Sequence, residues 1–190
     1  MIVEQLGTQV KMVAPLVDIY KRGDVSFAER VIDWLEKTES LMSKLHLKEG
    51  GEMSVLRSKI LKFSDVYRPS VEKPTQSMIR KGRLAEAAAA LERAEEILRV
   101  RIRESEERLS QFENKLCEGL TAFLLENTFP ENNGNYMAWL NLVWSMIRNQ
   151  PSTRALAIYI SASLVSYDRT YILENVISRL TDEELRKINV

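Results

Sequence analysis

The chain has 190 residues, of which 45% are hydrophobic and 28% charged, so it can bury a sizeable core. Lys plus Arg and Asp plus Glu both number 27, and the resulting formal net charge of zero gives no whole-chain attraction to nucleic acid or to a membrane surface. Only 7 glycines and 5 prolines are present, which argues against many short strands joined by tight turns. We therefore expect an all-α helical bundle of few, long elements.

The segment 1–67 is predicted to form three helices. Apolar residues spaced three and four apart run through 2–21, where Pro15 should kink or split the first helix and Gly23 should follow its end. A third helix is predicted over 52–67 on the same spacing.

Between these two lies a helix whose start and end both have sequence signals. Ser26 and Glu29 have the spacing of a capping box, in which each side chain bonds a free backbone N–H of the first turn. The helix should run from there to about His46. After the third helix, residues 68–77 contain two prolines and no periodicity, which predicts a linker.

One long amphipathic helix is predicted over about 78–127. Its apolar residues recur as the a and d positions of a heptad pattern, with faults at Glu95, Ser105 and Gly119. A helix over 84–126 would be roughly 65 Å long at 1.5 Å per residue, whereas a compact domain of this size is about 40 Å across. Such a helix must protrude, bend or pack on another subunit.

Two readings of this heptad seam remain open. The seam packs either inside one chain, as part of a helical bundle, or against a second copy in a homo-oligomer, most simply a dimer. In the second reading the oligomer interface consists of Leu84, Leu91, Leu98, Ile102, Leu109, Phe112, Leu116 and Phe123.

The remaining segment, 128–190, is predicted to form a small C-terminal helical subdomain. Its most apolar run, from Ala155 to Val165, is too short to cross a membrane, which needs about 20 residues. We interpret this run as a helix central to the C-terminal core. Thr181 and Glu184 form a second capping-box pattern, which predicts a short last helix.

The residues that usually carry chemistry are scarce. With one histidine, His46, and one cysteine, Cys117, a zinc site of the usual type would have to recruit carboxylates, and Cys117 has no histidine nearby in sequence to act as its base. No phosphate-binding loop, dinucleotide fingerprint, nucleophile elbow or HExxH motif is present. The sequence thus predicts no enzyme, no cofactor and no metal site.

The location of the protein is also predicted from this composition. A single cysteine excludes an intramolecular disulfide and fits a reducing compartment. The N-terminal sequence lacks the charged region and apolar core of a signal peptide. We therefore expect a cytoplasmic protein with no membrane partner.

Residues 57–83 are the one local charge anomaly, with a net charge of +6. Such a segment can bind the phosphate backbone of nucleic acid, although basic side chains also commonly border the buried face of a packed helix. The candidate nucleic-acid residues are Arg57, Lys59, Lys62, Arg68, Arg80, Lys81 and Arg83.

Three functions follow from these observations. The leading hypothesis is a non-enzymatic helical scaffold or regulatory subunit that self-associates through its long helix or binds another protein. The alternative is a nucleic-acid-binding protein that uses 57–83. The third hypothesis is a helical enzyme whose site assembles from scattered polar residues. No catalytic motif in the sequence supports it.

Overall fold

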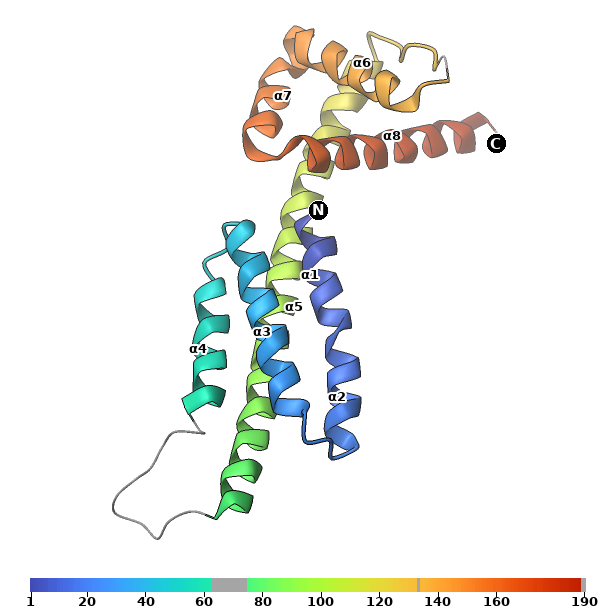
Figure 1. The fold of residues 1–190 in the computed structure, drawn as a ribbon. Helices are drawn as coiled ribbons and strands as arrows, with labels where there is room; N and C mark the ends of the chain where they lie inside the picture. Colours follow the sequence, from blue (N-terminus) through green and yellow to red (C-terminus); the bar gives the residue numbers. More distant parts are fainter. Residues whose placement is uncertain (63–74, 133, 189–190) are drawn as a thin grey trace. The chain divides into compact units, whose positions relative to one another are not determined.

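The computed structural model describes residues 1–62, 75–132 and 134–188, with side chains described as far as residue 180. These residues form eight helices and no strand, which confirms the predicted all-α class (Figure 1). The last residues of the predicted third helix and residues 68–74 of the predicted linker lie outside the described residues. The last two residues of that predicted linker, 76 and 77, are helical and begin α5.

The internal contacts divide the chain into two compact units, the N-terminal unit Ile2–Glu104 and the C-terminal unit Ser105–Val190. The longest helix, α5 (Gln76–Leu124), contributes residues to both units. The division falls at Ser105, one of the three faults in the heptad pattern. The predicted helix was longer than one compact domain is wide. Each part of α5 packs on a separate hydrophobic core, so no single core has to cover its whole length.

The helices of the N-terminal unit that precede α5 are α1 (Ile2–Lys11), α2 (Val13–Lys21), α3 (Phe27–Lys44) and α4 (Gly50–Lys62). The predicted split of the first helix is confirmed, because α1 and α2 are separate helices with Met12 between them. Pro15 lies in the first turn of α2, where a backbone N–H would have no helical partner.

Two of these helices end in the same backbone motif. Gly23 follows α2 with φ +68°, and His46 follows α3 with φ +55°. At the end of α3 the Leu47 N–H donates to the Met42 carbonyl over 2.9 Å, and the His46 N–H donates to the Ser43 carbonyl over 3.1 Å, which is the Schellman pattern. A left-handed conformation is normal for glycine but strained for histidine.

Both predicted capping boxes are wrong. The Ser26 side chain makes no capping bond to α3, and its hydroxyl instead accepts from Arg30 Nε over 3.1 Å. The Ser26 backbone N–H donates to Asp24 Oδ1 over 2.8 Å, so the local turn competes successfully with the cap. At the second position, α8 (Ser166–Ile188) runs through Thr181 without a break.

The core of the N-terminal unit has small residues on the α5 side. Ala87, Ala90 and Ala94 are buried there, and their size allows α5 to approach the other helices closely. Large side chains of this core come from α5 as well as from the helices before it, with Leu6, Leu35, Met42, Met53, Ile60 and Leu98 fully buried. The three alanines stand among these larger residues on the buried face of α5.

The C-terminal unit packs α6 (Tyr136–Asn149), α7 (Pro151–Ser163) and α8 on the last part of α5. The turn from α6 to α7 is a single residue, Gln150, followed by a proline at the first position of α7. The buried Thr153 hydroxyl donates to the Ile147 carbonyl over 2.6 Å and fixes this turn. On α6, Trp139 Nε1 donates to the Pro130 carbonyl over 2.6 Å.

A buried carboxylate joins α5 to α8 within this unit. Glu113, of which only 7% is exposed, accepts from Asn175 Nδ2 over 2.8 Å and from an Arg179 guanidinium nitrogen over 2.7 Å. Both oxygens therefore have a donor, as a carboxylate buried in a core requires.

Candidate interaction surface on the C-terminal unit

The exposed surface of α7 contains an apolar stripe that lies between the exposed polar residues Ser152 on one side and Arg154 and Ser161 on the other. Its exposed residues include Ile158 and Tyr159, of which 53% and 46% of the surface are accessible. Helix periodicity places these two side chains on one face with the exposed Pro151, Ala155 and Ala162. We call these five residues, Pro151, Ala155, Ile158, Tyr159 and Ala162, the α7 stripe.

The α7 stripe overturns the expectation that this helix is central to its core. Only Thr153, Ala157 and Ile160 of α7 are buried, and they face the other helices of the unit. The helix is apolar on both faces, so composition alone gave no indication that one face is uncovered. An apolar helix face left exposed over several turns is typical of a binding surface.

A close approach of α5 holds α7 in place. A Cβ atom on Gly119 would lie 2.5 Å from Leu156 Cδ2, so this position accepts no side chain unless Leu156 moves. The glycine that appeared as a fault in the heptad pattern therefore lies against the end of the Leu156 side chain of α7.

Basic side chains border the α7 stripe on both sides. On the side of α5, Lys115 Nζ lies 4.8 Å from the centre of the Tyr159 ring, and the Arg108 guanidinium donates to the Ser163 carbonyl over 3.1 Å. Tyr159 also contacts Phe112, with ring centres 5.5 Å apart. Helix periodicity places the exposed Arg154 on the opposite side of the stripe.

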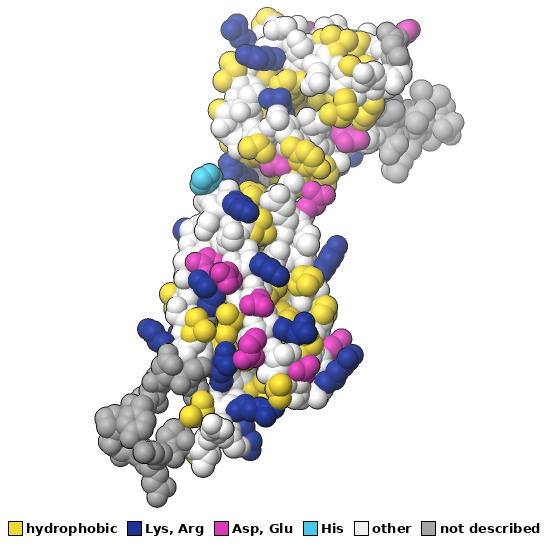
Figure 2. All heavy atoms as spheres, viewed as in Figure 1, with side chains coloured by type: hydrophobic (Ala, Val, Ile, Leu, Met, Phe, Trp, Pro, Cys, Tyr) yellow, Lys and Arg dark blue, Asp and Glu magenta, His cyan; other side chains and the backbone are white. Residues whose placement is uncertain are grey.

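The space-filling view shows hydrophobic side chains gathered on the visible face of the C-terminal unit, with basic side chains beside them (Figure 2). On the N-terminal unit, exposed large apolar residues are spread over several elements, with Tyr20 on α2, Val25 in the loop before α3, and Val55 and Leu61 on α4. Single exposed apolar residues of that kind are normal on a protein surface and need no partner.

The predicted oligomer interface lies in the two cores. Leu91 and Leu98 are buried in the N-terminal unit, and Phe112, Leu116 and Phe123 in the C-terminal unit. The three other members, Leu84, Ile102 and Leu109, are half-buried against the same cores. The seam thus already has partners within its own chain, and self-association through it stays a prediction.

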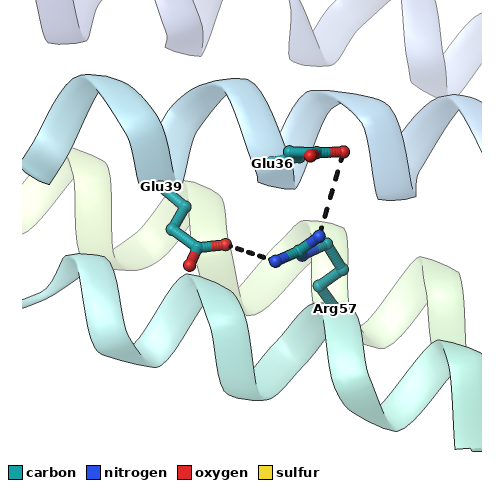
Figure 3. A network of polar contacts seen from close by, with 3 residues as sticks. All are labelled: Glu36, Glu39 and Arg57. Carbon is teal, nitrogen blue, oxygen red and sulfur yellow. Dashed lines mark hydrogen bonds and ion pairs between the residues drawn. The ribbon is translucent and has the colours of Figure 1, made fainter.

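The basic segment is partly neutralised within the N-terminal unit. Arg57, on α4, approaches two carboxylates of α3, Glu39 at 2.9 Å and Glu36 at 3.8 Å (Figure 3). Arg83, near the start of α5, pairs with Glu29 of α3 at 2.8 Å. Neither guanidinium is therefore free to take a phosphate without giving up an ion pair.

The other nucleic-acid candidates are distributed as follows. Lys59, Lys62, Arg80 and Lys81 are exposed, and Arg68 lies outside the described residues. Arg80 and Arg83 line an open groove of about 850 Å³ between the loop before α3 and the start of α5, but Asp24 and Glu29 line it as well. The mixed charge of this groove gives no selectivity for a polyanion.

No arrangement for catalysis or metal binding emerges from the described residues. Among them, no group of three or more His, Cys, Asp or Glu side chains could hold a metal ion. Glu113, the buried carboxylate, is used in joining α5 to α8. Over the same part of the chain, no helix has both the length and the apolar content to cross a bilayer.

Comparison of the chain with models of known protein families, with curated proteins and with solved structures finds no match in any of the three. Sequence reasoning missed the α7 stripe, although the apolar run that begins after Arg154 contains it.

Proposed function

We propose that this protein is a non-enzymatic helical interaction protein, a scaffold or regulatory subunit, that binds a partner protein through its C-terminal unit. The observation that carries the proposal is the α7 stripe, an apolar helix face with basic side chains on both sides. Interface hot spots are enriched in tyrosine and arginine, and the stripe contains Tyr159 with the exposed Arg154 beside it.

The form of interaction predicted from the sequence, self-association through α5, has less support than binding through α7. Its residues lie in or against the two cores, so a second copy could reach them only if the helices around α5 moved apart. Burial of that apolar surface within one chain removes the driving force for covering it with another.

A photo-crosslinking experiment tests the proposal. A photoreactive phenylalanine analogue would replace Ala155 on the stripe, and separately Lys37, an exposed residue of α3, in the cells that express the protein naturally. We expect a discrete protein adduct from position 155 and none from position 37. If position 155 gives only those adducts that position 37 also gives, or none, the proposal fails.

Nucleic-acid binding remains a second candidate on the exposed Lys59, Lys62, Arg80 and Lys81. An electrophoretic shift at low salt tests it, because phosphate contacts weaken steeply as salt rises. Replacing Lys59 and Lys62 by glutamate should then weaken binding equally for all sequences. Absence of any shift with single- or double-stranded probes at low salt would eliminate this candidate.

A further inference from the structure

We infer that the α7 stripe takes an amphipathic α-helix of a partner protein whose apolar residues are flanked by Asp and Glu. This inference rests on the proposed function and deepens it, since it assigns the chemical class of the partner. Three features of the surface support it: the spacing of the stripe, the charge along its edges, and the symmetry that a second copy would impose.

The spacing of the stripe suits a helix. Ala155, Ile158 and Ala162 follow one another at three and four residues, with Tyr159 beside Ile158. The two alanines leave room at both ends for a second helix to approach, and the two large side chains stand between them as a ridge. Helices pack by placing such ridges into the grooves of a neighbour, and partner helices are commonly bound through apolar residues at this spacing.

The charge along the edges favours an acidic partner. Arg108 and Lys115 border the stripe on the α5 side, and Arg154 borders it on the other. On α5 itself, helix periodicity turns Glu118 further than Lys115 from Gly119, the residue that contacts Leu156 of α7. Carboxylates at the edges of a bound helix would therefore face cations on both sides, which speeds association and excludes basic partners.

Symmetry argues against a second copy of this chain on the stripe. A two-fold axis that makes two α7 helices antiparallel brings the same edge of each copy together, so that Lys115 and Arg108 face their own equivalents. A two-fold axis parallel to the helices places the α5 edge of one copy against the Arg154 edge of the other. Like charges meet in both arrangements, which destabilises either dimer.

The test uses the full chain and two synthetic helical peptides of about 20 residues, a length at which helix formation in water is practicable. Both peptides carry leucine at the same positions of one face, and their flanking positions are glutamate in one and lysine in the other. Binding is measured by fluorescence anisotropy at low and high ionic strength. We expect the glutamate peptide to bind at least about tenfold more tightly than the lysine peptide, with the difference shrinking as salt rises.

Substitutions then locate the site. Ile158→Glu should abolish binding of the glutamate peptide, while Val55→Glu, an equally exposed apolar residue of α4, should leave it unchanged. Lys115→Glu combined with Arg154→Glu should invert the preference, so that the lysine peptide binds more tightly. Circular dichroism of each variant checks that the helices are retained.

Equal affinity for the two peptides, or no effect of Ile158→Glu, would overturn the inference. A dimer in light scattering that Ile158→Glu dissociates would assign the stripe to a second copy and overturn it as well. Adducts from position 155 together with failure of the peptides would leave the proposed function standing and remove only the acidic helix. No adduct from position 155 would remove both.

Discussion

Replacement of Glu113 should loosen α8 from α5 while leaving the N-terminal unit intact. The carboxylate is buried on α5, and both of its donors, Asn175 and Arg179, come from α8. Glu113→Ala removes both hydrogen bonds and leaves the partly buried Asn175 amide without its acceptor. Glu113→Gln keeps an acceptor for Asn175 but turns its amide nitrogen, a donor, toward the Arg179 guanidinium.

The expected loss in the free energy of unfolding follows from the exposure of the two donors, Asn175 and Arg179. A hydrogen bond from a partly buried amide to a charged acceptor contributes about 1.5–3 kcal/mol. The Arg179 side chain is 54% exposed, and its ion pair is screened by solvent, so it contributes about 0.5–1 kcal/mol. We therefore expect Glu113→Ala to cost about 2–4 kcal/mol and Glu113→Gln about 1 kcal/mol.

Hydrogen exchange measured by mass spectrometry resolves the effect by region. A loss of about 2–4 kcal/mol raises the open fraction by roughly 30–900-fold, and α8 amides of Glu113→Ala should exchange faster in proportion. Amides of α3 and α4 are an internal control, since they belong to the N-terminal unit. Unchanged protection of α8 in Glu113→Ala, or equal losses in the alanine and glutamine variants, would refute this reasoning.

Three further predictions concern local structure. His46→Gly should stabilise the N-terminal unit by about 1 kcal/mol in urea unfolding, because glycine takes the left-handed conformation without strain; a loss of stability would contradict this. Gly119→Leu should destabilise the C-terminal unit, and adding Leu156→Ala should restore part of the loss, whereas simple additivity of the two costs would disprove the close contact. The backbone N–H of Ser26 and then its side chain hold the pKa of Asp24 below its usual 3.8. Its contribution to stability should be present above that value and lost as pH falls through the lower folded pKa; an NMR titration midpoint of Asp24 at or above 3.8 would contradict it.

The sequence was sufficient for the fold class and for several helix ends. Pro15 and Gly23 act through the backbone alone, so their effects on the first helices could be predicted without knowing any neighbour. The heptad pattern likewise identified Leu91, Leu98 and Leu116 as buried. The pattern contains no information about what covers these residues, and the structure places them in two cores within the chain.

Other features depend on contacts that a linear pattern does not contain. The buried face of α5 in the N-terminal unit contains Ala87, Ala90 and Ala94 beside its leucines, and alanine gives little hydrophobic signal. Glu95, a fault in the heptad pattern, pairs with Arg99 over 2.6 Å, as the four-residue spacing of the two charges predicts. The left-handed His46 could not be predicted, because histidine rarely adopts that conformation.

The exposed face of α7 shows the same limit. An apolar run predicts burial, but a helix that is apolar all round can be buried on one face and offer the other to a partner. Ala157 and Ile160 lie on the buried face of α7, whereas Ile158 and Tyr159 lie on its exposed face.

A crosslinking scan along α7 tests the central claim most directly. The photoreactive residue would be placed in turn at Ala155, Ile158, Ser161 and Ala162, all of which are exposed, in the cells that express the protein naturally. We expect the same adduct from positions 155, 158 and 162, which lie on the α7 stripe. Position 161 should give little adduct, because helix periodicity turns it toward the edge of the stripe. Equal yields at all four positions, or none at any, would contradict it.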